Sequence, residues 1–262
     1  MANARAIWSG TLGFGLVNIP VKLVSAVQSE EIDFDMLSKQ DMAPIRYARI
    51  DTKTGEEVEW KDIVKGYQYA KGKYVVVDNE DFEKASPQKS RSIYILQFSK
   101  AEEIDPIFFE KPYYIVPGKG GEKSYKLLVK ALEETGNVGI AEFMLRNREH
   151  VCAIRSHNDI LILNQMRYQE EVRDVPEITA AKKAKVSQQE LELAIKLIDH
   201  LTETFNPAAF KDTYIAELKK IIKAKAAGKH IRIAEPEAKA TATVKDLMEV
   251  LKRSLEKGKK RA

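Results

Sequence analysis

Over the first two thirds of the chain, apolar and polar residues alternate in short runs that are separated by turn-forming residues. This period of two is typical of β-strands. Apolar side chains fall on both faces of these runs, which favours a mixed β/α fold built on a sheet that closes into a barrel and is covered on its outside. We expect strands at residues 6–23, 73–77, 92–98, 113–116, 139–145, 151–155 and 159–165.

Three of these strands follow one another closely. The run from Ile140 to Tyr168 contains three apolar stretches separated by RNRE and HND, which predicts a three-stranded antiparallel meander. One helix interrupts the strand pattern, and we expect Ser124 to cap its start and Gly136 to end it. Residues 28–95 are charged, rich in turns and studded with aromatic residues, so we interpret them as an insertion into the barrel.

The paired glycines of SGTLGFGLVNIPVK, residues 9–22, raise the alternative of a phosphate-binding loop. A dinucleotide fingerprint needs a third glycine that opens a helix, and a P-loop needs Gly-Lys followed by Ser or Thr. Neither is present, and Pro20 with its β-branched neighbours favours extended chain. Glycine within a strand marks a bend or a close backbone approach, so we predict one curved strand here.

Beyond Pro176 the pattern becomes helical. Ser187 and Glu190 form a capping box, which apolar residues follow at helical spacing, namely Leu191, Ala194, Ile195, Ile198, Leu201 and Phe205. After Asn206-Pro207, a second helix is predicted from about Asp212 to Ala226, closed by Gly228. Its inward side chains are expected to be Tyr214, Ile215, Leu218, Ile221 and Ile222.

The end of the chain reads as a linker followed by a short helix. The segment IAEPEAKATA has the low hydrophobicity of a flexible linker. Thr243 can cap an amphipathic helix, and the basic tail KGKKRA follows it. This helix docks either onto its own domain or, as the linker favours, into the groove of a partner. The candidate partner-binding residues are Val244, Leu247, Met248, Leu251 and Leu255.

Composition and charge narrow the class of protein. The chain has 262 residues, enough to bury a sizeable core. A single cysteine excludes an internal disulfide, and the start MANARAIWSG has no apolar signal region, so we expect a cytoplasmic protein without a membrane span. Residues 1–181 carry 24 Lys and Arg against 28 Asp and Glu, whereas residues 182–262 carry 19 against 11. This asymmetry suggests contact with nucleic acid.

No catalytic motif stands out, so a binding role is favoured over a barrel enzyme and no cofactor or metal site is expected. His150 and Cys152 could act as base and thiol nucleophile, but a lone cysteine among Val151, Ala153 and Ile154 is more typical of sheet packing.

Two groups of basic residues could contact phosphates without reading bases. One lies in the insertion, where Tyr47 stands between basic residues, and the other lies on the basic face of the second C-terminal helix. A solvated charged surface is the alternative for both groups. The candidate DNA-binding residues are Lys39, Arg46, Arg49, Lys53, Lys84, Lys89, Arg91, Lys219, Lys220 and Lys223.

Three long stretches resemble the prokaryotic Ku proteins of non-homologous end joining. They are ARAIWSGTLGFGLVNIPVKL, then TGEEVEWKDIVKGYQYAKGKYVVV, then the run that begins EEIDPIFFEKPYYIVPGKGGEKSYKLL and ends NREHVCAI. The resemblance covers the chain to about residue 230 and is specific because the stretches recur in order. It implies a Ku-type β-barrel at 1–185 with a bridge at 28–95, a helical arm at 186–230 and a flexible region at 231–262.

The resemblance also implies a non-enzymatic function. A homodimer, whose bridges jointly close a ring, would thread onto double-stranded DNA ends. The segment TVKDLMEVLKRSLEKG is similar to the element through which these proteins engage the ATP-dependent DNA ligase D. The basic tail is shorter than in some relatives. A general architectural DNA-binding protein is the alternative, and linear and closed circular DNA distinguish the two.

Overall fold

The computed structural model describes residues 5–28, 31–85, 91–146, 148–176 and 184–228. These fall into two compact units, Met1–Asp174 and Val175–Ala262. Each unit is described here by itself.

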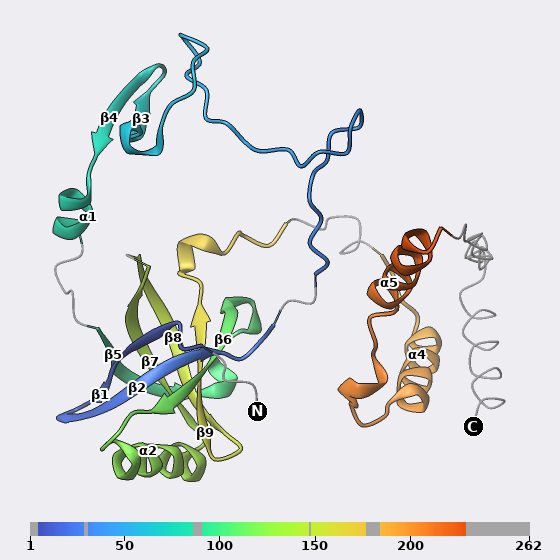
Figure 1. Cartoon of the computed structure of the whole chain (residues 1–262). Helices are drawn as coiled ribbons and strands as arrows, with labels where there is room; N and C mark the ends of the chain where they lie inside the picture. The colour runs from blue at the N-terminus through green and yellow to red at the C-terminus, as the bar shows by residue number, and fades with distance from the viewer. Residues whose placement is uncertain (1–4, 29–30, 86–90, 147, 177–183, 229–262) are drawn as a thin grey trace. The chain divides into compact units, whose positions relative to one another are not determined.

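The first unit is built on a closed β-barrel, as the sequence predicts (Figure 1). Its described strands follow the order β1-β2-β6-β9-β8-β7-β5. All neighbouring pairs are antiparallel except β1 and β5, whose parallel pairing closes the barrel and is reinforced by a 2.9 Å hydrogen bond between the Thr11 and Ser92 hydroxyls. The strands are β1 (Trp8–Phe14), β2 (Val17–Ser25), β5 (Ser92–Lys100), β6 (Phe109–Pro117), β7 (Asn137–Leu145), β8 (Arg148–His157) and β9 (Ile160–Met166).

The prediction of a single curved strand at residues 6–23 is wrong. The segment forms a β-hairpin in which Phe14 pairs with Val17 and the loop consists of Gly15 and Leu16. Gly15 has a φ of 57°, and a two-residue hairpin loop of type II′ needs such a φ at its first position, where glycine has no steric penalty. The glycine therefore reverses the chain instead of bending a strand.

The predicted meander is confirmed. β7 pairs with β8 and β8 pairs with β9, both antiparallel and in the order of the chain.

Short 3-10 helices occur at Ala101–Glu103, Pro106–Phe108 and Gln169–Glu171.

Helix α2 (Glu122–Thr135) lies across one end of the barrel (Figure 1). It contacts β2, β7 and β8, and its buried side chains join the core formed by inward-facing strand residues. Gly136 ends the helix in a left-handed conformation, as predicted. Ser124 is not the N-cap residue, however. The helix begins at Glu122, three residues before the start expected at Tyr125, and Gly121 is its N-cap residue. The buried helix residues are Tyr125, Leu128, Val129 and Leu132.

Apolar side chains are also exposed on the outer face of the barrel. Tyr94 and Leu96 on β5, and Tyr114 and Val116 on β6, are each more than a third exposed. Among the described residues this part of the outer face is therefore not covered, in contrast to the expectation from the sequence.

The chain between Ser25 and Ser92 is inserted between two barrel strands. It contains a two-stranded sheet of β3 (Lys65–Ala70) and β4 (Lys73–Val77), a 3-10 helix at Trp60–Asp62 and helix α1 (Asn79–Ala85). The sequence predicted β4 but not β3. No side chain described in residues 31–85 is buried, so this part of the insertion has no core of its own.

The second unit contains α4 (Gln188–Leu201) and α5 (Thr213–Ala226), with a 3-10 helix at Pro207–Ala209 between them. The predicted capping box of Ser187 and Glu190 is present, and the Asp212 carboxylate caps α5. Phe205 is not part of the helix, because α4 ends at Leu201; its ring stacks instead on Phe210 at 5.8 Å.

Within the described part of the chain, no helix is long and apolar enough to cross a membrane.

Candidate nucleic-acid interface

Lys39 lies at the tip of a compact loop in the insertion. An antiparallel bridge between Leu37 and Pro44 closes the loop, and the Ser38 amide donates a 2.8 Å hydrogen bond to the Ala43 carbonyl. Hydrogen bonds from the Ser38 side chain and the Ala43 amide hold the pKa of Asp41 below its usual value. The charged Asp41 thus fixes the turn, and the Lys39 side chain points into solvent.

Lys53 lies at the tip of a second loop that is built in the same way. Ile50 pairs with Glu57, and the Asp51 carboxylate accepts hydrogen bonds from the amides of Lys53 at 2.7 Å and Thr54 at 3.3 Å. These two bonds lower the pKa of Asp51. The loop therefore presents an exposed lysine on a backbone that its own aspartate organises.

The two predicted arginines lie between the loops. Arg46 is exposed. The Arg49 guanidinium lies 4.6 Å from the centre of the Trp60 ring, which fixes its position by a cation–π interaction. Tyr47, 85% exposed, donates a 3.5 Å hydrogen bond to the Met36 sulfur. Arg49 keeps its charge and donors while stacked, so it can still contact a phosphate.

Sequence reasoning missed the basic residues of the β3–β4 hairpin. Lys71 and Gly72 form its turn, and Lys65 and Lys73 lie at its two ends. The Lys65 ammonium lies 4.6 Å from the centre of the Phe82 ring of α1. The signal in the sequence was Lys-Gly-Lys between two strand-like runs, which places lysine at a hairpin tip once β3 is recognised.

The remaining insertion candidates differ in their surroundings. Lys84 is exposed in α1 and lies 3.9 Å from Glu80, a separation at which a surface ion pair contributes little. Arg91 is exposed directly before β5, and its carbonyl accepts a hydrogen bond from the Thr11 amide. Lys89 lies outside the described residues.

Three lysines of the second unit share one exposed side of α5. Lys219 and Lys223 lie one turn apart, and Lys220 is adjacent and forms a 2.5 Å ion pair with Glu217. The ion pair partly neutralises Lys220. The structure therefore shows these lysines as one patch and the insertion lysines as separate tips.

The His150–Cys152 pair has no catalytic arrangement. Both residues occupy inward positions on β8, where Cys152 is fully buried in the core. Burial raises the pKa of the Cys152 thiol far above its usual value, so the thiol stays protonated. In the residues that the structure describes, no group of three or more His, Cys, Asp or Glu side chains could hold a metal ion.

The candidate partner-binding residues, Val244, Leu247, Met248, Leu251 and Leu255, lie outside the described residues, as does the basic tail.

Comparison with known proteins gives a consistent result. A family model described as the Ku70/Ku80 beta-barrel domain matches residues 13–193. The chain is 39% identical over 253 residues to the non-homologous end joining protein Ku of Opitutus terrae, covering 96% of this chain and 91% of the relative. It is 41% identical to the protein of the same name from Archaeoglobus fulgidus, covering 96% and 98%. It is 34% identical to the protein of the same name from Bacillus subtilis, over 97% of this chain and 82% of the relative.

Proposed function

The chain belongs to the Ku family, and from this premise we propose that it binds the ends of double-stranded DNA without sequence specificity. Two copies form a ring through which the duplex is threaded. The ring then recruits and stimulates the ATP-dependent DNA ligase D. The protein itself acts by binding and not by catalysis.

The observation that carries this proposal is the insertion between β2 and β5. It contains more than fifty described residues, none of which has a buried side chain. A two-stranded hairpin and two small loops do not bury enough apolar surface to be stable on their own. A long segment of this kind, anchored at both ends in a rigid barrel, is suited to surround a partner. Its exposed tips carry Lys39, Lys53 and Lys71.

The chemistry of these tips favours phosphate contacts. Lysine ammonium groups on exposed turns can approach the DNA backbone from many directions, and contacts to phosphate carry no sequence information. The insertion contains no helix long enough to fill a major groove among its described residues, since α1 spans only Asn79–Ala85. This supports binding that depends on the form of the DNA and not on its sequence.

The second unit supports the homodimer. Leu191, Ile195, Ile198 and Leu201 lie on one side of α4 and are each 47% to 64% exposed. α4 and α5 do not pack extensively on each other. An apolar stripe that the described residues of its unit leave exposed to water is typical of a protein interface, and a symmetric dimer is the commonest assembly of identical chains. Tyr94, Leu96, Tyr114 and Val116 on the barrel offer a second exposed apolar surface.

The experiment that tests the proposal uses DNA topology. Linear and relaxed closed circular DNA present the same phosphates, so electrostatic attraction alone does not separate them. The protein is loaded onto linear DNA, the ends are joined by an added ligase, and the complex is washed in high salt. We expect protein to remain on the sealed circle and to be absent from a circle that was never opened.

Two results would contradict the proposal. Equal binding to the unopened circle would show a general DNA-binding protein that coats intact duplex. Complete release from the sealed circle in high salt would show that the chain does not encircle DNA. A solution mass of the free protein, expected to be twice 29.7 kDa, tests the dimer separately from DNA binding.

A further inference from the structure

The two ends of the barrel differ in chemistry. At one end the inward side chains of β6, β9 and β8 are apolar and meet α2, whose Tyr125 hydroxyl lies 2.6 Å from the Ile115 carbonyl oxygen. At the other end the inward positions of the same three strands become polar. Lys111 on β6 pairs with Gln165 on β9, and Gln165 pairs in turn with Cys152 on β8. His150 precedes Cys152 by two residues on the same inward face of β8. α2 therefore closes the apolar end, and the opposite end is an open polar mouth.

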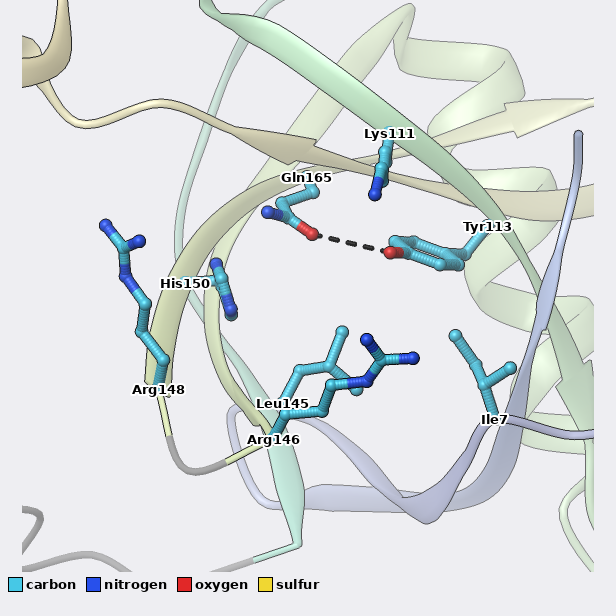
Figure 2. A pocket seen from close by; sticks show the side chains of 8 residues that line it. All are labelled: Ile7, Lys111, Tyr113, Leu145, Arg146, Arg148, His150 and Gln165. Carbon is cyan, nitrogen blue, oxygen red and sulfur yellow. Dashed lines mark hydrogen bonds between the residues drawn. The ribbon is translucent and has the colours of Figure 1, made fainter. Parts of the chain in front are cut away.

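The barrel mouth contains a cavity of about 300 Å³ (Figure 2). Its wall combines cationic side chains with hydrogen-bond donors and two apolar residues. The residues that line it are Ile7, Lys111, Tyr113, Leu145, Arg146, Arg148, His150 and Gln165. In Figure 2 the side chains of Lys111 and Arg146 reach toward the cavity from opposite walls, and the Tyr113 ring lies between them.

The lining residues differ in whether their polar groups already have partners. The Arg148 guanidinium donates a 2.7 Å hydrogen bond to Glu171, and the Gln165 amide donates a 3.0 Å bond to Glu110. In contrast, the Lys111 and Arg146 side chains form no ion pair or hydrogen bond with any residue that the structure describes. Both cations line one concave space, where a bound anion is attracted to each of them.

Tyr113 supplies a neutral donor beside these cations. Its hydroxyl donates to the Gln165 side-chain oxygen across 3.5 Å, which is long for a bond between oxygens, so a closer acceptor can replace that contact. Burial, and then the charge of Glu110, raise the pKa of Tyr113, so the hydroxyl keeps its proton.

The turn between β7 and β8 fixes where the Arg146 side chain begins. Arg146 has a φ of 53°, as a two-residue hairpin turn requires, and Asn158 and Asp159 in the next hairpin turn have φ of 50° and 62°. The turn directs the guanidinium into the cavity in Figure 2.

We propose that the barrel mouth binds a phosphate group through Lys111, Arg146 and the Tyr113 hydroxyl. The charges of Lys111 and Arg146 match a phosphate dianion, and a guanidinium can contact two of its oxygens at once. The Glu110 carboxylate, which acts on Tyr113 and His150, offsets part of this positive charge. The cavity is larger than the group itself, so it also accommodates part of the molecule that carries the phosphate. A small phosphate ester in solution and the terminal phosphate of a DNA strand share this chemistry. The site does not depend on the proposed threading of DNA.

The first experiment uses the wild-type full-length chain with inorganic phosphate and pyrophosphate as probes. The chain has only four histidines, whose ring signals can be followed by NMR. His150 lies in the cavity wall, whereas His157 lies at the far end of β8. We expect the His150 signals to shift saturably with pyrophosphate and the His157 signals to stay in place. Sodium chloride at matched ionic strength is the control. No shift at His150, or equal shifts at both residues, would overturn the proposal.

The second experiment uses a matched pair of double variants. Lys111→Met with Arg146→Asn removes both charges, and asparagine tolerates the left-handed backbone at residue 146. Lys126→Met with Arg155→Asn removes the same charges from exposed positions away from the cavity. We expect at least a tenfold loss of pyrophosphate affinity in the first pair, measured by calorimetry, and less than a twofold loss in the second. Equal affinities in the two pairs would overturn the proposal.

A final arm distinguishes the two sources of phosphate. If the site takes a DNA-terminal phosphate, a 5′-phosphorylated duplex binds the wild type more tightly than a 5′-hydroxyl duplex, pyrophosphate competes, and the Lys111 and Arg146 variant loses the difference. If both duplexes bind equally while pyrophosphate still shifts His150, the ligand is a small phosphate ester. A failure of DNA threading would leave the pyrophosphate results unchanged, so the two proposals fail separately.

Discussion

A buried hydrogen bond joins Tyr125 of α2 to Leu161 of β9: the tyrosine hydroxyl accepts from the Leu161 amide at 2.8 Å. The same hydroxyl donates to the Ile115 carbonyl at 2.6 Å. One side chain thus satisfies backbone groups of two neighbouring barrel strands and fixes the helix that closes this end of the barrel.

We therefore expect Tyr125→Phe to destabilise the protein. The substitution keeps the ring but leaves a buried amide and a buried carbonyl without this partner, at a cost of about 1–3 kcal/mol. Urea unfolding followed by circular dichroism measures the change. Tyr114→Phe removes a hydroxyl from the exposed outer face of β6 and is the control, with an expected change below about 0.5 kcal/mol. Equal effects of the two substitutions would show that the hydroxyl does not hold the helix.

A second prediction concerns acid pH and His150. Burial, followed by the charge of Arg148, lowers the pKa of His150 below its usual value, and Glu110 partly opposes the shift. Unfolded histidine titrates near pH 6.5, so between that value and the lower folded pKa the unfolded chain binds more protons. His150 therefore lowers the free energy of unfolding as the pH falls below about 6.5.

We expect His150→Gln to reduce the loss of stability between pH 7.5 and pH 5. The measurement is the urea midpoint at several pH values, compared with the wild type. His157→Gln, which replaces an exposed histidine of the same strand, is the matched control substitution. Parallel curves for wild type and His150→Gln would mean that this histidine does not control the acid range.

A third prediction concerns partner binding by the C-terminal segment, and it rests on the sequence pattern. Val244, Leu247, Met248, Leu251 and Leu255 form an apolar stripe at helical spacing after a linker. Leu247→Glu with Leu251→Glu places two charges in the stripe and should abolish capture of the ATP-dependent DNA ligase D, while DNA binding is retained. Val250→Glu adds a charge outside the stripe and is the control. Capture that survives the double substitution would show that the ligase binds elsewhere.

Local signals in the sequence predicted much of the barrel. The three strands that contain Ile140, Cys152 and Leu163 were identified because polar turns separate their apolar runs. The hairpin at Gly15 was missed because apolar residues continue through the turn, where Leu16 is fully exposed. A run of this kind does not show where the chain reverses.

Features that depend on distant residues could not be predicted. The parallel pairing of β1 with β5 joins segments separated by the whole insertion, so no local pattern records it. The cavity at the barrel mouth could not be predicted for the same reason, because Lys111, Arg146 and Gln165 are brought together only by the strand register. Lys39 and Lys53 were chosen as candidates because charge and turn residues are local signals, and their contact with DNA stays a prediction.

The last prediction tests those lysines directly. Lys39 and Lys53 occupy the tips of two loops whose backbones are held by Asp41 and Asp51, so neutralising the lysines leaves the turns intact. For B-DNA, the slope of log affinity against log salt falls by about 0.9 for each phosphate contact that is lost. Because the proposed ring contains two copies of the chain, Lys39→Gln with Lys53→Gln removes four lysines from it, and we expect the slope to fall by about 3.6. Fluorescence anisotropy with a short linear duplex at several salt concentrations measures the slope.

The control for this double variant is Lys126→Gln with Lys130→Gln, which removes two exposed charges from α2 and leaves the net charge equal. Its slope should match that of the wild type, because net charge alone acts weakly across a screened distance. Repeating the titration with a duplex of different sequence should give the same affinities, since phosphate contacts do not read bases. An unchanged slope in the Lys39 and Lys53 variant would remove the loop tips from the DNA interface. Affinities that change by about 1–3 kcal/mol per substituted base pair would instead show direct base readout.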